Sequence, residues 1–216
     1  SFYVFPKIKR ILVMVDKDGD ENYQPMIIPI EGGFPQPSFD NFFANYRVHL
    51  VKCDNEKNIV YFVAERRDKP TYETYRGGLK TGKLEKIAES AFPIEVPDHS
   101  KDHRKALLST TYLAGDGVLY LQNRDIRKVL YGTPQEDRKE GETTPLNGLG
   151  FAAFSPSEKG VLVISSVFED TYSLGYINIA KPGDLERVDL KGVEHKGVGE
   201  LVEIEHLIDN RYLVIF

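Results

Sequence analysis

A repeated pattern of strands and turns is the feature that most constrains the fold of this chain. Each copy contains a short apolar strand, a polar turn and a second strand rich in β-branched and aromatic residues. The two clearest copies run through the turn Ser155–Gly160 into Val161–Val167, and through Asp54–Asn58 into Ile59–Ala64. The turns end near positions 10, 58, 117, 160 and 211, a spacing of about 50 residues. This spacing is typical of four-stranded β-propeller blades.

The pattern therefore predicts an all-β fold of four-stranded antiparallel β-propeller blades. We expect about four to five blades in an incomplete ring, which form a single partial propeller domain over residues 1–216. The blade repeats fall near residues 1–40, 48–90, 105–135, 150–190 and 200–216.

One blade can be followed strand by strand. Its strands are predicted at Val48–Cys53, Ile59–Glu65, Thr71–Leu79 and Lys83–Ala88. The second strand is almost wholly apolar, which is expected where neighbouring blades cover both faces. The fourth strand is polar, as suits an exposed outer edge.

Helix signals are weak along the chain. The best candidate is Asp98–Leu108, with Asp98 as a possible N-cap. Residues 133–147 are polar, charged and contain proline, which predicts a long loop between blades.

Both ends of the sequence fall inside predicted structure. Residues 1–6 already resemble a packed strand, and Phe216 lies within the second strand of the last repeat. We therefore expect a longer parent protein and an open blade edge through which this chain self-associates.

Composition limits the partners and the compartment. With 41% hydrophobic residues and a net charge of -5, the chain predicts a packed core and argues against nucleic acid as the main partner. No apolar run reaches the roughly 18 residues that would predict a membrane span, and no signal peptide is recognisable. Cys53 is the only cysteine, which fits a reducing, cytoplasmic location.

Alternating carboxylates between Asp16 and Asn22 raise the possibility of a calcium site. Calcium prefers six to eight oxygen ligands, but the glycine and glutamate spacing of the helix-loop-helix calcium loop is missing. A β-hairpin turn is the favoured interpretation, because Asp and Gly supply turn geometry.

His99 and His103 have a spacing that suits zinc if the segment is helical. No third ligand is obvious, and Lys101, Arg104 and Lys105 would repel a cation. A solvated segment without a metal is therefore favoured.

The other histidines and the cysteine carry weaker signals. His49 and His206 occupy related places on first strands, and with Glu203 they are the only hints of an axial metal site. His195 is isolated. Cys53 follows His49 by four residues on the same predicted strand, where the two side chains share a face but lie too far apart to pair easily, so a structural thiol is favoured.

Nucleophilic and phosphate-binding motifs are missing from the sequence. No Gly-x-Ser-x-Gly elbow occurs, and Ser155 and Ser157 lie in a turn beside Pro156. Gly77-Gly78 and Gly148-Leu149-Gly150 lack the strand-to-helix context of a phosphate loop. We therefore predict no catalytic, cofactor-binding or metal-binding residues and no cofactor.

Two segments resemble known propeller families. Phe154–Gly160 resembles the Phe-Ser-Pro-Asp-Gly-Lys turn of TolB-type propellers, with Ser157 and Glu158 in place of the usual Asp-Gly. Ile11–Gln24 together with Ile28–Pro35 resembles a blade of the prolyl oligopeptidase family of serine peptidases, with its Asp-x-Asp-Gly-x-Glu turn and Leu-x-Gly-Gly-x-Pro strand end.

The resemblance implies a function for the whole parent protein. In that family the propeller gates an α/β-hydrolase domain of the same chain, restricts access to peptides and contributes no catalytic residue. Two alternatives stay open: a stand-alone propeller that binds a protein partner, and a metal-dependent propeller hydrolase.

Overall fold

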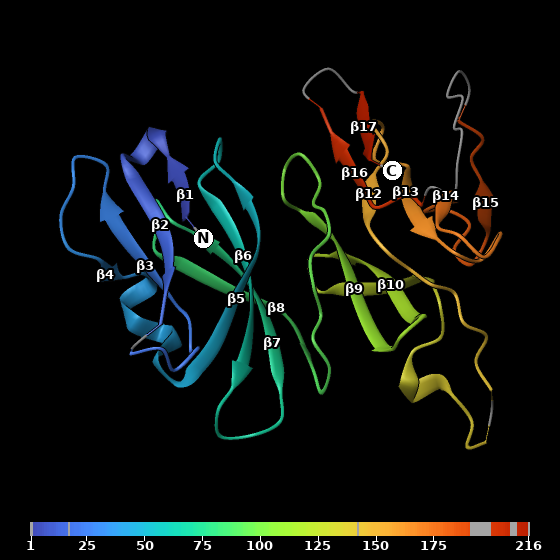
Figure 1. The fold of residues 1–216 in the computed structure, drawn as a ribbon, viewed down its shortest axis with the longest axis horizontal. Coiled ribbons are helices and arrows are strands. Elements are labelled where there is room, and N and C mark those ends of the chain that lie inside the picture. Colours follow the sequence, from blue (N-terminus) through green and yellow to red (C-terminus); the bar gives the residue numbers. More distant parts are fainter. Residues whose placement is uncertain (1, 17, 142, 191–199, 208–210, 216) are drawn as a thin grey trace. The chain divides into compact units, whose positions relative to one another are not determined.

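The computed structural model describes residues 2–16, 18–141, 143–190, 200–207 and 211–215. They fall into two compact units, residues 1–96 and 97–216, which are described one at a time. Within each unit every strand pair is antiparallel, and consecutive strands of the sequence are neighbours in their sheets (Figure 1).

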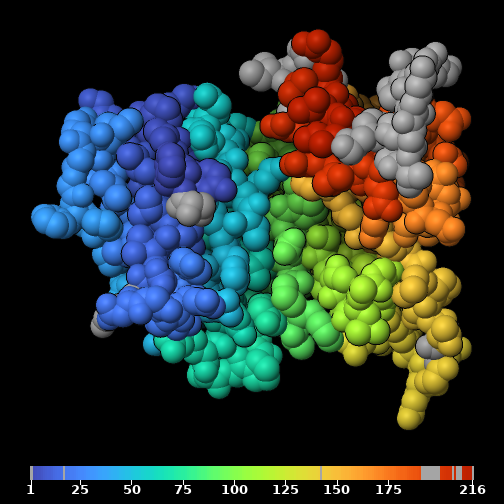
Figure 2. Space-filling model, viewed as in Figure 1, coloured from blue at the N-terminus to red at the C-terminus, as the bar shows by residue number. Residues whose placement is uncertain are grey.

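Unit 1 (residues 1–96) contains two four-stranded sheets. Its elements are β1 (Phe2–Phe5), η1 (Pro6–Ile8), β2 (Arg10–Val15), β3 (Gln24–Pro29), β4 (Gln36–Pro37), η2 (Phe39–Asn45), β5 (Tyr46–Asp54), β6 (Ile59–Arg66), β7 (Tyr72–Gly78) and β8 (Lys83–Ser90). Phe5 and Leu12 of the first sheet share one hydrophobic cluster with Val48 and Phe62 of the second. On the face shown in Figure 2, atoms of the first sheet lie next to atoms of the second.

Unit 2 (residues 97–216) continues with sheets of three, four and two strands. Its elements are β9 (Lys105–Leu113), β10 (Asp116–Asn123), β11 (Ile126–Tyr131), η3 (Gln135–Asp137), β12 (Ala152–Phe154), β13 (Gly160–Ser165), β14 (Ser173–Asn178), β15 (Leu185–Arg187), β16 (Glu203–His206) and β17 (Tyr212–Ile215).

Strand β12 shows why the inner strands read as continuous apolar runs. Ala152 and Phe154 join a cluster that contains Leu119 of β10, whereas Ala153 joins a second cluster that contains Ile204 of β16. Successive side chains on a strand point to opposite faces, so each face of β12 is buried against a different sheet. An apolar residue is therefore required at every position.

The all-β fold class is confirmed. Several four-stranded antiparallel sheets follow one another along the sequence and are consistent with an incomplete β-propeller. That residues 1–216 form a single domain stays a prediction.

The helix expected at Asp98–Leu108 is wrong. Residues 100–104 form a turn, and β9 begins at Lys105 and pairs with β10. The Ser100 hydroxyl accepts the backbone N–H of Lys105 (2.9 Å) and donates to Asp102 Oδ1 (2.8 Å). Such local side-chain bonds compete with a helix, and strand pairing then outweighs the local propensity.

A β-bulge interrupts the alternation of β5. Leu50 pairs with Phe62, Lys52 pairs with Tyr61 and Val51 is the extra residue between them. The bulge therefore adds to β5 one residue that has no partner on β6. Beyond it, the alternation of side chains between the two faces of the sheet is shifted by one residue.

Candidate functional site

The acidic segment from Asp16 to Asn22 connects β2 to β3, as expected of a hairpin turn. Asp20 Oδ1 accepts the backbone N–H of Asn22 at 3.0 Å, and Asn22 Nδ2 donates to Asp20 Oδ2 at 2.9 Å. Gly19 has a φ of 78°, in the left-handed region that glycine adopts without strain. The carboxylate of Asp20 is therefore used to fix the turn.

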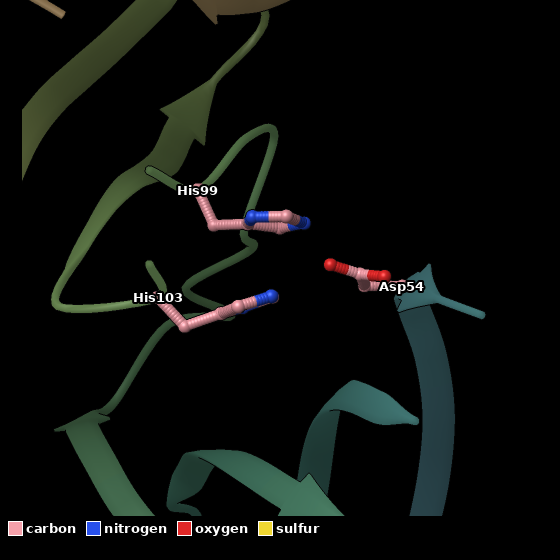
Figure 3. Close-up of side chains that lie close together, drawn as sticks. All are labelled: Asp54, His99 and His103. Carbon is pink, nitrogen blue, oxygen red and sulfur yellow. The ribbon is translucent and has the colours of Figure 1, made fainter. Parts of the chain in front are cut away.

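His99 and His103 lie close together although they are not on a helix. Their ring centroids are 4.0 Å apart and their planes are inclined by 22°, so that the two imidazoles stack (Figure 3). Figure 3 also labels Asp54, the last residue of β5, which belongs to unit 1. The pairing that the spacing suggested is thus present, but a turn produces it.

The bulge in β5 separates His49 from Cys53. Cys53 packs against the unit 1 core and stands opposite Val60, whereas His49 is exposed and stands opposite Val63, which points away from that core. The prediction that the two side chains share a face is therefore wrong. Burial raises the pKa of the Cys53 thiol to about 12, which leaves it protonated and inert at neutral pH.

Ser155 and Ser157 stabilise the turn between β12 and β13. Ser155 Oγ accepts the backbone N–H of Gly160 at 3.1 Å and lies 3.3 Å from Ser157 Oγ. Both hydroxyls are thus engaged in the turn itself, which gives them a local structural role.

Of the remaining candidate residues, the structure places Glu203 and Gly77 but not His195 or the side chain of His206. Glu203 is exposed on β16, while the side chain of His206 and the whole of His195 lie outside the described residues. Gly77 is the last residue but one of β7, where a Cβ would come within 2.6 Å of the Phe39 ring, so its role is to admit that ring.

Glu73 in β7 is the centre of a buried polar network that the sequence does not reveal. Its side chain is 4% exposed. One oxygen accepts the hydroxyls of Tyr46 (2.7 Å) and Tyr75 (2.8 Å), and the other lies 3.4 Å from Lys86 Nζ and 4.0 Å from Arg66. The carboxylate is thus both hydrogen-bonded and partly charge-compensated, as a buried acid requires.

The network changes the ionisation of its members. Burial opposes the charged form of Glu73, but the hydrogen bonds from Tyr46, Tyr75 and Lys86 outweigh it and hold the pKa of Glu73 below its usual value. Burial, together with hydrogen bonding to Tyr46 and Glu73, raises the pKa of Tyr75. Glu73 is therefore ionised and Tyr75 neutral across the physiological range.

An aromatic cluster covers this network. Its members come from η2 and from the strands of the second sheet, and they meet mostly edge to face: Phe39, Phe42, Phe43, Tyr46, Phe62 and Tyr75. Phe42 is 46% exposed and stacks on Tyr46, with the Arg66 guanidinium 5.8 Å from the Tyr46 ring centre. The exposed side of the cluster is an aromatic surface next to a cation.

In unit 2, Arg138 from the loop after β11 reaches a buried carboxylate on β10. Its guanidinium donates two parallel hydrogen bonds to Asp116 (2.7 and 2.8 Å) and two more to the Thr133 carbonyl. It also lies 4.9 Å from the centre of the Tyr112 ring. This one side chain therefore anchors the loop to the sheet.

A cavity of about 470 Å³ lies in unit 2 beside the same loop. It has the size of a small-ligand or side-chain pocket. Most of its lining is apolar, and the lining residues are Val129, Leu130, Tyr131, Gly132, Thr133, Thr144, Pro145, Leu146, Asn147, Val167, Pro182 and Gly183. Leu146 in its wall is 70% exposed.

Among the described residues, no helix is both long and apolar enough to cross a membrane. No protein-family profile matches the sequence, and no curated protein matches it either.

Solved structures do match the fold. TolB from Acinetobacter baumannii superposes with a TM-score of 0.62 at 14% identity, over 96% of this chain and 47% of that one. A putative TolB from Agrobacterium tumefaciens gives 0.54 at 16%, over 85% and 62%. The β-propeller domain of the Trilobed protease from Pyrococcus furiosus gives 0.51 at 15%, over 94% and 57%. This chain thus spans about half to three fifths of the structures that it matches, and its structural neighbours are TolB-like β-propellers.

Proposed function

We propose that this chain is the propeller segment of a prolyl oligopeptidase-like serine peptidase, and that it gates the entry of peptides to an α/β-hydrolase domain of the same parent chain. The observation that carries the proposal is the agreement of two independent signals. The β2–β3 hairpin holds the peptidase-like Asp-x-Asp-Gly-x-Glu turn, and a protease propeller domain is similar in fold. Fold similarity alone would leave the activity open.

The cavity of unit 2 gives this gate a specific contact. Its apolar lining and exposed Leu146 suit the apolar side chain of a passing peptide, since burial of such a side chain is favourable by about 1.5–3 kcal/mol. In this proposal the segment contributes no nucleophile, and cleavage belongs to the hydrolase domain.

The test uses the full-length product of the natural gene and a fluorophosphonate probe. We expect covalent labelling of a serine outside residues 1–216, cleavage of short peptides and resistance of folded proteins. Residues 1–216 expressed alone are the control and should not be labelled. A full-length product without labelling would refute the peptidase proposal.

A substitution separates gating from chemistry. Leu146→Asp in the full-length protein should raise KM for apolar peptides and leave kcat for a small ester substrate unchanged, because only the path of the peptide is altered. An unchanged KM for apolar peptides in the Leu146→Asp variant would contradict the role of the cavity.

The second candidate function is a stand-alone scaffold for a protein partner. Large apolar side chains on the surface favour it, since Phe34 is 89% and Ile126 is 71% exposed. Recovery of a stoichiometric protein partner with a full-length protein that the fluorophosphonate probe does not label would favour this alternative.

The proposal also includes a cytoplasmic location and self-association through open blade edges. Sedimentation velocity at high concentration should show oligomers of residues 1–216. A strictly monomeric profile would contradict self-association.

A further inference from the structure

The turn before β9 holds two histidines in an arrangement that the proposed gating function does not use. The rings of His99 and His103 stack at 4.0 Å and project from the turn in the same direction (Figure 3). An imidazole ring binds a metal ion through the lone pair of one of its nitrogens, so two adjacent rings can offer two ligand atoms to one ion.

A hydrogen bond decides which nitrogen of His99 carries that lone pair. His99 Nδ1 lies 3.1 Å from the carbonyl oxygen of Ser100, which accepts hydrogen bonds and cannot donate them. Nδ1 is therefore protonated, and the lone pair of the neutral ring is on Nε2. A backbone carbonyl that fixes the tautomer in this way is the usual second interaction of a metal-binding histidine.

The cations near the pair are compensated by carboxylates. Lys105 Nζ lies 3.3 Å from Glu158, and Arg104 Nε lies 3.4 Å from Asp102. The objection that the basic residues of this segment repel a metal ion therefore loses most of its force, because two of the three basic side chains are paired.

Hydrogen bonds hold the turn from within and from the turn between β12 and β13. Within it, Ser100 bonds to Asp102 and to Lys105. From the other turn, Glu158 Oε1 accepts the backbone N–H of Lys101 at 2.7 Å. His103 and Glu158 both have left-handed φ angles, 59° and 53°. Left-handed backbone at non-glycine residues is strained and tends to collect at functional sites.

We infer that His99 and His103 bind a divalent transition-metal ion that prefers imidazole ligands, with Zn²⁺ as the ion to test. Imidazole nitrogen suits zinc, copper and nickel, whereas calcium and magnesium prefer oxygen. His99 would offer Nε2 and His103 one of its ring nitrogens, with the two ligand atoms within 4.8 Å of each other, and water molecules would complete the coordination. Bound metal would fix the turn that leads into β9.

The experiment is a Zn²⁺ titration of residues 1–216 after treatment with a chelator, followed by calorimetry and by NMR of the imidazole Cε1–H signals. We expect one site, with Zn²⁺ shifting the signals of His99 and His103 among the five histidines. His99→Ala and His103→Ala should each weaken binding tenfold or more, which corresponds to about 1.4 kcal/mol.

The matched control is His49→Ala, an exposed histidine on β5 that should bind Zn²⁺ as the unaltered chain does. Unchanged affinity in both variants of the pair, or NMR shifts confined to other histidines, would overturn the inference. If a variant fails to fold by circular dichroism, the NMR assignment on the unaltered chain decides the question by itself.

Discussion

Unit 1 and unit 2 each bury a carboxylate, and they stabilise it by opposite means. Glu73 in unit 1 receives two tyrosine hydroxyls from its own sheet at hydrogen-bond distance, and its cations lie at 3.4 and 4.0 Å. Asp116 in unit 2 has one bidentate partner, Arg138, at 2.7 and 2.8 Å. Glu73 thus depends on several neighbours and Asp116 mainly on one.

The difference shows what each carboxylate does for the fold. Tyr46, Tyr75 and Lys86 belong to the strands around Glu73, so that network holds a sheet together internally. Arg138 comes from the irregular segment after β11, so the pair with Asp116 decides the path of a loop that also lines a cavity. A carboxylate that several neighbours stabilise should tolerate the loss of one neighbour better than a carboxylate that depends mainly on one.

The sharpest test of this comparison is Arg138→Ala. It leaves the Asp116 carboxylate buried without its main partner, so we expect a loss of about 3–5 kcal/mol in the free energy of unfolding by denaturant titration. The control is Arg187→Ala, which removes an exposed pair with Glu169 and should cost about 1 kcal/mol or less. Equal losses of unfolding free energy in the two variants would show that the Asp116–Arg138 pair stabilises the fold no more than an exposed ion pair does.

Tyr46→Phe is the corresponding change in unit 1. It removes one of the hydrogen bonds to the Glu73 carboxylate and leaves the Tyr75 hydroxyl in place, so we expect a loss of about 1.5–3 kcal/mol. Tyr3→Phe, at a tyrosine outside this network, is the matched control. A loss of unfolding free energy as large as that of Arg138→Ala would show that Glu73 depends on Tyr46 as strongly as Asp116 depends on Arg138.

The pH dependence of unfolding tests the same network, because it reports the protonation of Glu73. The pKa of Glu73 is lower in the folded chain than its value of 4.5 in the unfolded chain, so its contribution to stability is present above pH 4.5 and is lost as the pH falls through the folded pKa. Glu73→Gln should therefore flatten the dependence of unfolding free energy on pH as the pH falls below 4.5. A slope identical to that of the unaltered chain would contradict the lowered pKa.

How far the sequence predicts these features depends on the range of the interaction. The strands around Ile59–Glu65 and Val161–Val167 could be predicted because apolar patterning and turn residues are local signals. The burial of Glu73 could not, because its hydrogen-bond partners come from three strands whose packing no local pattern encodes. Arg138 lies in a segment that reads only as a loop, and its pairing with Asp116 spans 22 residues.

Two errors have the same physical origin. The helix at Asp98–Leu108 failed because β9 pairs with β10, and the shared face of His49 and Cys53 failed because Val51 is an extra residue. Both are consequences of strand pairing, which a single stretch of sequence does not display.

The smallest effect is expected at Glu158, where the TolB-type turn has glycine. Glu158→Ala keeps the left-handed backbone and loses the bonds to Lys101 and Lys105, so it should cost about 1–2 kcal/mol. Glu158→Gly loses the same bonds but relieves the strain, so it should be about 1 kcal/mol more stable than the alanine variant. Thermal unfolding of the two variants measures the difference, and a glycine variant that is less stable than the alanine variant would show that the strain is absent.

The bulge at Val51 has a consequence for how such a chain can change its length. Leu50 and Cys53 face the same core although they are three positions apart, and Phe62 and Val60 opposite them keep regular alternation. One residue can therefore be gained or lost at this point while every other residue of β5 keeps its partner on β6 and its own face. A strand of this kind absorbs single-residue insertions and deletions, which allows repeats of unequal length to descend from a common unit without exposing their cores.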